Sequence, residues 1–292
     1  MELPKTALLG VGLMGRPMAL NLAHGGVPLT VWNRSAGKCE GLEADGITIA
    51  PTAESAVANA EVVISMVADG AITKALVETC APAMDRDAVW VDMSSTKPSD
   101  ARDVSATLET AGIHFVDAPV SGGTKGAEAG SLAIMAGGDT GVIERIAPVL
   151  SLMGRPVRVG PTGSGQLAKL ANQAIVAVTI GAVAEAMLLL EEGGADPEAV
   201  RDALKGGFAD STILQQHGAR MTTRNFDPGG LSRLQLKDLN NALEEALSHS
   251  LHLPMTEQVR ARFQRYIEDL SGGERDHSGL YQELRDLNGM TQ

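Results

Sequence analysis

The order of strand-like and helix-like segments is the feature that most constrains this fold. From residue 5 to about residue 159, short apolar runs alternate with segments of helical spacing such as 14–24. After Gly160 the strand-like runs stop. Alternation of this kind predicts an α/β class of fold with a doubly wound, mostly parallel sheet. We therefore predict a dinucleotide-binding Rossmann-type domain over 1–161, followed by an all-α domain over 162–292.

The chain of 292 residues is long enough for two such domains, because single cores stop growing near this length. The expected strands lie at 6–10, 28–33, 47–49, 61–67, 88–93, 113–118, 132–138 and 156–160. The expected helices of the second domain lie at 165–192, just after Asp196-Pro197, and at 211–221, 231–249, 254–270 and 276–288, with 271–279 as a loop.

The longest apolar run, 170–190, is long enough to span a bilayer. It contains Asn172, Gln173 and Glu185, and its many small residues suit close helix packing. We therefore expect a long helix between protein surfaces and no membrane partner.

Charge and cysteine content exclude other classes of protein. Asp and Glu total 36 against 24 for Lys and Arg, and aromatic residues are only 3%, so a nucleic-acid partner is not expected. Cys39 and Cys80 form no disulfide framework and have no metal-ligand spacing. We expect reduced thiols, a cytoplasmic protein and no metal site.

The stretch "LLGVGLMGRPMALNL" carries a G-x-G-x-x-G spacing directly after the first expected strand. Gly10 allows a tight turn, Gly12 lets the backbone approach a pyrophosphate, and Gly15 lets the helix pack on the strand. The intervening Leu13 and Met14 open a helix whose N-terminus attracts anions. In this context the spacing predicts dinucleotide binding.

The end of the second strand, "VWNRS", predicts which dinucleotide binds. NAD sites of this type usually place a carboxylate there for the ribose hydroxyl, whereas an arginine accommodates a 2′-phosphate. This chain has Asn33, Arg34 and Ser35 and no carboxylate before Glu40. We predict NADP (NADPH) as the preferred cofactor, with NAD as the alternative.

Two further strand ends, "MVADG" and "DMSST", point to the same edge of the sheet. Ligands of open α/β sheets bind beyond the carboxyl ends of the strands. Backbone at Val67 and Ala68 and the hydroxyls of Ser94, Ser95 or Thr96 are therefore candidates to line the cofactor. Such hydroxyls also serve as ordinary helix caps, so this alternative stays open.

A glycine-rich loop, "DAPVSGGTKGAEAGS", joins two expected strands. Ser121, Gly122 and Gly123 can present a hydroxyl and close backbone N–H groups to a carboxylate. The alternative is a flexible surface turn.

"GSGQLAKLANQ" places Lys169 and Asn172 three residues apart on one helical face, ahead of an apolar segment. A buried ammonium without a partner is costly, so Lys169 faces either solvent or a polar cleft. Hydride transfer to a carbonyl needs a proton donor, and Lys169 is our candidate, with Asn172 binding substrate or aligning the lysine.

Together these stretches resemble the β-hydroxyacid dehydrogenase family, over nearly the whole chain. "GVGLMGRPMALNL" resembles its cofactor fingerprint, "DAPVSGG" its substrate signature and "GSGQLAKLANQ" its catalytic-lysine segment. "LQLKDLNNALEEA" is similar to its C-terminal K-D-L motif.

The resemblance implies an NAD(P)-dependent oxidoreductase that acts on a small β-hydroxyacid or acid semialdehyde. It implies that Ser121, Gly122 and Gly123 bind the substrate, Lys169 is the acid/base and Asn172 assists. It also implies that Lys237 lies near both cofactor and substrate, that a long helix joins the domains, and that the subunits form homodimers or homotetramers.

Gln173 and the Asn33-Arg34 pair favour the tartronate semialdehyde (2-hydroxy-3-oxopropionate) reductase branch. The alternatives are a 3-hydroxyisobutyrate dehydrogenase or another short-chain semialdehyde reductase. An imine reductase would share this architecture, but the resemblance to that class implies a different residue at the position of Lys169. An alternative hypothesis, from a different functional class, is a catalytically silent dinucleotide-binding module. Such a module is expected to lack that lysine.

Overall fold

A computed structural model describes residues 2–290 and contains two compact units, Met1–Lys169 and Leu170–Gln292. The sequence placed the domain boundary at 161/162, in the turn before helix α7 (Ser164–Glu192). The division by contacts falls inside α7, directly after Lys169.

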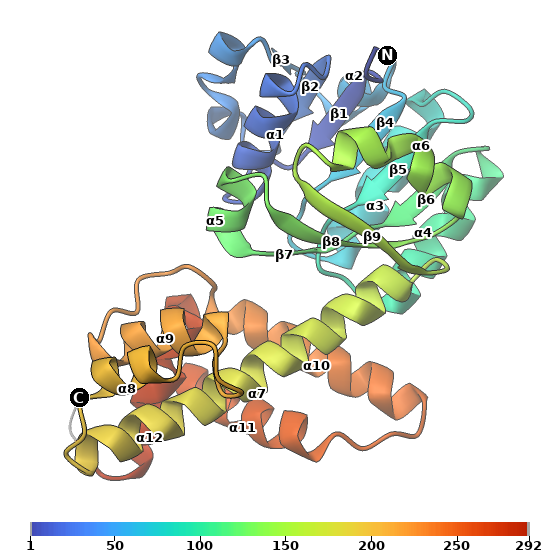
Figure 1. Cartoon of the computed structure of the whole chain (residues 1–292). Helices are drawn as coiled ribbons and strands as arrows, with labels where there is room; N and C mark the ends of the chain where they lie inside the picture. Colours follow the sequence, from blue (N-terminus) through green and yellow to red (C-terminus); the bar gives the residue numbers. More distant parts are fainter. Residues whose placement is uncertain (1, 291–292) are drawn as a thin grey trace. The chain divides into compact units, whose positions relative to one another are not determined.

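The first unit is built on one mixed sheet with strand order β3-β2-β1-β4-β5-β6-β8-β7, and β9 pairs with β8 (Figure 1). Pairs from β3 to β6 are parallel, β8 is antiparallel to β6 and β7, and β9 is parallel to β8. The strands are β1 Thr6–Leu9, β2 Leu29–Trp32, β3 Thr48–Ile49, β4 Val62–Ser65, β5 Val89–Asp92, β6 His114–Asp117, β7 Val120–Ser121, β8 Leu132–Gly137 and β9 Gly154–Gly160. The α/β fold and the parallel arrangement predicted from the sequence are confirmed.

Both faces of this sheet are covered, because alternate residues of each central strand pack into different cores. In β1, Leu8 belongs to one apolar core and Ala7 and Leu9 to the other. The helices of this unit are α1 Gly15–His24, α2 Ala53–Val57, α3 Gly70–Cys80, α4 Pro98–Thr110, α5 Gly123–Glu128 and α6 Thr140–Leu150. Burial on both faces explains why the central strands are continuous apolar runs.

The glycine-rich loop after β6 is more ordered than the sequence predicted. It contains the two-residue strand β7 and the six-residue helix α5. The expectation of an irregular connection was therefore wrong for part of this segment, because β7 gains its hydrogen bonds by pairing with β8.

The described part of the second unit consists of helices and short turns around one apolar core (Figure 1). It continues α7 and adds α8 Pro197–Ala203, α9 Thr212–Thr222, α10 Ser232–Ser248, α11 Pro254–Glu268 and α12 Leu280–Leu287. Single side-chain caps start two of these helices: Asp196 accepts from the first turn of α8, and Ser211 from that of α9. The all-helical prediction for this region is confirmed.

Helix α7 is long and apolar enough to cross a membrane by length and composition alone. The core helix of a soluble protein passes the same test. Side chains on one side of α7 are buried in the second core, among them Ala177, Ile180 and Ala184. Ile175 and Leu189 lie elsewhere on the helix and are 67% and 74% exposed.

Candidate active site

The glycine turn after β1 is as tight as its spacing predicted. Gly10 has a φ of +105°, and a Cβ on it would lie 2.2 Å from the Met66 carbonyl oxygen. A Cβ on Gly15 would lie 1.9 Å from the Gly10 carbonyl oxygen. Around Gly12, by contrast, a Cβ would meet no atom within 4 Å. Glycine is thus required by the fold at 10 and 15, whereas at 12 it leaves open space beside the backbone.

This open space adjoins the N-terminus of α1. The N-cap residue Met14 makes no side-chain hydrogen bond to the first turn, and that turn contains no acidic residue. Leu13 is 77% exposed. Uncapped N–H groups and the positive end of the helix dipole suit an anion. The chain's own residues therefore fit a dinucleotide pyrophosphate here.

Asn33 ties the glycine turn to the end of β2. Its Oδ1 accepts a 2.9 Å hydrogen bond from the Val11 N–H, and its Nδ2 donates to the Ser35 carbonyl oxygen at 3.0 Å. Arg34 is exposed and makes no hydrogen bond or ion pair with any residue in the described range 2–290. Asn33 holds this corner together, and the adjacent guanidinium is open to a ligand.

The hydroxyl of Ser94 is used inside the protein. Ser94 is fully buried, and its Oγ accepts a 2.9 Å hydrogen bond from the Val67 N–H. It also bonds to the carboxyl of Asp92, whose pKa is raised to about 6 by burial. Ser94 therefore fixes the backbone at Val67, beside the exposed Ala68, instead of presenting a free hydroxyl.

Thr96 behaves differently. Its side chain is nearly fully buried, and its Oγ1 has no hydrogen-bond partner among the residues that the structure describes. An orphaned buried hydroxyl is uncommon in folded proteins. The Thr96 hydroxyl thus has hydrogen-bonding capacity left for a ligand.

Asp117, the first residue of the substrate signature, anchors the start of α7. Its Oδ1 accepts from the Gly163 N–H and its Oδ2 from the Gln166 N–H, both at 2.8 Å. Burial raises the pKa of this carboxyl to about 7. The approach is close, since a Cβ on Gly165 would lie 2.4 Å from the Asp117 carbonyl oxygen.

Gln166 also ties the start of α7 to the segment that follows β5. Its Nε2 donates to the Ser94 carbonyl oxygen at 2.8 Å, and its Oε1 accepts from the Thr96 N–H at 2.9 Å. Asp117 and Gln166 were missed by the sequence analysis, although both stand inside quoted motifs. The sequence did carry a signal for them, because each is a polar residue at a position where the neighbouring apolar residues predict burial.

These bonds place Lys169 one helical turn beyond Gln166, within the first unit, and Lys169 is half-buried. Ser121 ends β7, and the exposed Gly122 and Gly123 follow with φ of +141° and +61°. Positive φ values favour glycine at both positions, so the backbone there carries no side chain that would cover its N–H groups. Asp117 therefore connects the glycine-rich segment that contains Ser121 to the start of α7, the helix that contains Lys169.

In the second unit, Asn172 belongs to a chain of hydrogen bonds. Its Nδ2 donates to Gln173 Oε1 at 2.9 Å, and Gln173 Nε2 donates to Asp238 Oδ2 at 2.8 Å. The other carboxylate oxygen of Asp238 lies 3.4 Å from Lys237 Nζ. The Lys237-Asp238 pair is thus connected to Asn172 across 65 residues of sequence.

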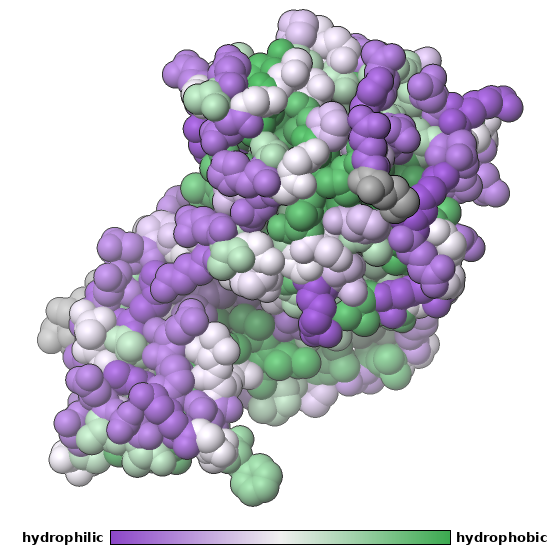
Figure 2. All heavy atoms as spheres, turned by 45° about the horizontal axis from the view of Figure 1, so that its top comes forward, coloured by the Kyte–Doolittle hydropathy of each residue, from purple (hydrophilic) through white to green (hydrophobic). Residues whose placement is uncertain are grey.

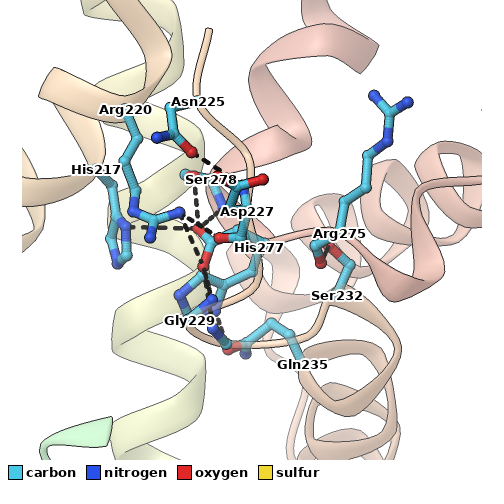
Figure 3. Close-up of polar contacts among 12 residues, drawn as sticks. His217, Arg220, Asn225, Asp227, Gly229, Ser232, Gln235, Arg275, His277 and Ser278 are labelled. Carbon is cyan, nitrogen blue, oxygen red and sulfur yellow. Dashed lines mark hydrogen bonds and ion pairs between the residues drawn. The ribbon is translucent and has the colours of Figure 1, made fainter. Parts of the chain in front are cut away.

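A second polar cluster fixes the loop before α12. The Asp276 carboxylate accepts from the backbone N–H groups of Gly229, Gly230 and Ser278, and from the Ser278 hydroxyl. Figure 3 shows His217, Arg220 and His277 converging there from different segments. His217, Asp276 and His277 offer three potential metal ligands within 4.8 Å, but the Asp276 oxygens are saturated and Arg220 lies 3.5 Å away. We therefore interpret this cluster as a structural one, which holds the loop before α12 against the segment at Gly229 and Gly230.

Comparison with known proteins gives the family. Residues 5–163 match the NAD binding domain of 6-phosphogluconate dehydrogenase, and residues 163–284 match the NAD-binding domain of NADP-dependent 3-hydroxyisobutyrate dehydrogenase. The chain is 40% identical to 2-hydroxy-3-oxopropionate reductase of Escherichia coli K12, over 96% of this chain and 97% of that protein. It is 32% identical to a probable 3-hydroxyisobutyrate dehydrogenase of Mycobacterium tuberculosis H37Rv, over 96% and 97%.

Among solved structures, the Mycobacterium tuberculosis 3-hydroxyisobutyrate dehydrogenase with L-serine is similar, with a TM-score of 0.89 and 30% identity. The match covers 97% of this chain and 99% of that one. The chain belongs to the β-hydroxyacid dehydrogenase family and is an NAD(P)-dependent oxidoreductase.

Proposed function

We propose that this enzyme reduces 2-hydroxy-3-oxopropionate (tartronate semialdehyde) with NADPH, using Lys169 as the proton donor. The observation that carries the proposal is the double anchor of the lysine helix. Asp117 and Gln166 hold the first turn of α7 against the strand ends that follow the dinucleotide motif. Lys169 follows one helical turn later, so the anchored helix would hold its ammonium near the carboxyl ends of the strands, where the cofactor is expected to bind.

The cofactor would supply a hydride to the aldehyde carbon. The developing alkoxide then needs a proton, which the Lys169 ammonium donates, and in the reverse direction the neutral amine removes it. Ser121 and the N–H groups at Gly122 and Gly123 would bind the substrate carboxylate, because a hydroxyl and oriented amides complement an anion. Asn172 would contact the substrate beside the reacting carbon, and Lys237 would bind near cofactor and substrate, as the resemblance of the K-D-L segment implies.

The dinucleotide itself would lie along Gly10, Gly12, Leu13, Met14 and Gly15, with Val67, Ala68 and Thr96 beside it. The preference for NADP rests on Arg34, whose guanidinium is exposed and unpaired among the described residues. Arginine pairs well with phosphate. Asn33 occupies the place of the usual carboxylate and would not repel a 2′-phosphate. NAD is the alternative cofactor.

The substrate assignment is supported by the relative at 40% identity, which is named for 2-hydroxy-3-oxopropionate. The solved relative that holds L-serine binds an acid with a hydroxymethyl group, which is the reduced form of the same functional class. Oxidation of 3-hydroxyisobutyrate is the second candidate, because the relatives at 30–32% identity carry that name.

We expect a cytoplasmic homo-oligomer formed through the helical unit. Large apolar side chains are exposed there, including Leu247, Leu251 and Met255 at 69%, 57% and 61%. Figure 2 shows hydrophobic surface, in green, among the hydrophilic side chains of the helical part. Exposed apolar area of this kind is typical of protein contacts. Sedimentation velocity would test the oligomer.

The function is tested by initial rates with NADPH and NADH against tartronate, methylmalonate and succinic semialdehydes. We expect the highest kcat/KM for NADPH with tartronate semialdehyde. Faster turnover of methylmalonate semialdehyde would favour the 3-hydroxyisobutyrate alternative. Binding of NADPH without turnover of any aldehyde would favour a catalytically silent dinucleotide-binding module.

A further inference from the structure

Gln173 of α7 hydrogen-bonds through both ends of its side-chain amide, to its neighbour Asn172 on the same helix and to Asp238 on α10. Its Oε1 accepts from Asn172 Nδ2 at 2.9 Å, and its Nε2 donates to Asp238 Oδ2 at 2.8 Å. The Nε2 also lies 3.4 Å from Gln235 Oε1. Gln235 in turn donates its own Nε2 to the Gln173 carbonyl oxygen at 3.0 Å. The backbone and side chain of Gln173 are therefore both held by α10.

The direction of these bonds is set by Asp238. A carboxylate only accepts hydrogen bonds, so Gln173 must turn its NH₂ group toward Asp238. The side-chain oxygen Oε1 of Gln173 then faces Asn172. Asn172 must therefore turn its own side-chain NH₂ group toward Gln173. Asp238 is 4% exposed, so water does not readily replace Gln173 as its donor. The buried carboxylate of Asp238 thus fixes the orientation of the Gln173 amide, and the Gln173 amide in turn fixes the orientation of Asn172.

The consequence is that the Oδ1 of Asn172 points away from Gln173. Within residues 2–290, no group donates a hydrogen bond to this oxygen. A carbonyl oxygen held in this way complements a ligand that carries a hydrogen-bond donor. Of the two candidate substrates, 2-hydroxy-3-oxopropionate offers a hydroxyl on the carbon next to the aldehyde, whereas methylmalonate semialdehyde has a methyl group there.

We propose that Gln173 is a positioning and specificity-determining residue, which orients Asn172 to accept a hydrogen bond from the substrate 2-hydroxyl. This inference rests on the proposed function, because it assumes that Asn172 contacts the substrate. A site built to bind a hydroxyl discriminates strongly against an analogue that lacks it. Gln173 therefore favours 2-hydroxy-3-oxo acids over 2-methyl-3-oxo acids.

The first test compares Gln173→Met with wild type on both aldehydes. Methionine keeps the length of the side chain but makes no comparable hydrogen bond. We expect kcat/KM for 2-hydroxy-3-oxopropionate to fall about tenfold, which corresponds to roughly one lost hydrogen bond, and kcat/KM for methylmalonate semialdehyde to fall less than threefold. Equal falls for both aldehydes, or no fall for either, would overturn the proposal.

Two further variants guard against a folding defect. Asp238→Leu keeps a side chain of similar size but removes the acceptor for Gln173 Nε2, so it should reduce the preference for 2-hydroxy-3-oxopropionate over methylmalonate semialdehyde. Gln216→Met makes the same substitution at an exposed position of α9 and should leave both rates unchanged. A reduced substrate preference in Gln216→Met, or an unchanged preference in Asp238→Leu, would contradict the assignment.

A measurement without turnover separates this inference from the proposed function. The side-chain NH₂ signals of Asn172, assigned with Asn172→Ala, report its hydrogen bond to Gln173 in ¹⁵N spectra. We expect these signals to shift in Gln173→Met and to stay in place in Gln216→Met. If wild type reduced neither aldehyde, the proposed substrate would be wrong, whereas unmoved Asn172 signals would overturn the positioning role itself.

Discussion

The carboxylate of Asp117 accepts a 2.8 Å hydrogen bond from the backbone N–H of Gln166, and this bond joins the substrate signature to the lysine segment. The two residues are 49 positions apart in the sequence. Asp117 lies at the end of β6, four residues before Ser121, and Gln166 lies three residues before Lys169. One buried carboxyl therefore positions both groups that the proposed chemistry requires.

Asp117→Asn should change how stability depends on pH. The pKa of Asp117 is raised by burial to about 7, above its unfolded value near 3.8, so the folded chain binds this proton more tightly. Stability from this group is therefore present at low pH and is lost as pH rises to about 7. We expect the free energy of unfolding of wild type relative to the variant to fall by about 2 kcal/mol from pH 5 to pH 7.

This change is measured by urea unfolding at several pH values, followed by tryptophan fluorescence. Both tryptophans, Trp32 and Trp90, lie in the first unit, so the signal reports on that unit. Asp92 also has a raised pKa, about 6, but it is present in both proteins and its effect cancels. A difference between the two proteins that did not vary with pH would contradict the raised pKa of Asp117.

Gln166→Leu should destabilise the first unit by about 2–5 kcal/mol. The change leaves the Ser94 carbonyl oxygen and the Thr96 N–H buried without their partner, and each unsatisfied group costs roughly 1–3 kcal/mol. The urea midpoint of tryptophan fluorescence checks this loss. Gln216→Leu, on an exposed surface of α9, is the matched control and should shift the midpoint little. Equal midpoints in the two variants would show that the Gln166 bonds contribute nothing.

The sequence predicted those parts of the fold whose pattern is local. Helix α7 was expected at 165–192 and spans Ser164–Glu192, because the segment contains no proline and ends at paired glycines. The central strands were predicted because their apolar runs are short and bounded by turns. Strand β7 was missed, since two residues are too few to show an alternating pattern and its pairing with β8 is tertiary.

The candidate site was predicted as a set of residues but not as a network. The sequence placed Lys169, Asn172 and Lys237 in motifs, but no local pattern connects Gln173 to Asp238, 65 residues later. Asn33 was interpreted through its place at the end of β2, yet its bond to the Val11 N–H shows that it also holds the glycine turn. Hydrogen bonds between distant segments depend on the packed fold, which residue spacing does not reveal.

Arg34→Ala should weaken NADPH selectively. If the exposed guanidinium pairs with the 2′-phosphate, its removal raises the KM for NADPH about tenfold or more, because charge-assisted hydrogen bonds contribute roughly 1.5–3 kcal/mol. The KM for NADH should stay within about threefold. Initial rates at saturating aldehyde measure both constants, and Arg86→Ala is the control, as another exposed arginine of the same unit. Parallel increases for both cofactors would contradict a role in phosphate recognition.

Lys169→Ala should lower kcat by about 10²–10⁴, which is the usual contribution of a positioned general acid. The tethers at Asp117 and Gln166 act through backbone and through Gln166 itself, so removing the lysine side chain should leave the helix start in place. NADPH affinity, followed by cofactor fluorescence, should therefore stay within about threefold of wild type. Lys205→Ala removes a surface lysine paired with Asp202 and should leave kcat unchanged. A Lys169→Ala enzyme that kept kcat within threefold of wild type would assign the proton to another donor, whereas a joint loss of kcat and NADPH binding would indicate that Lys169 supports the fold of the site.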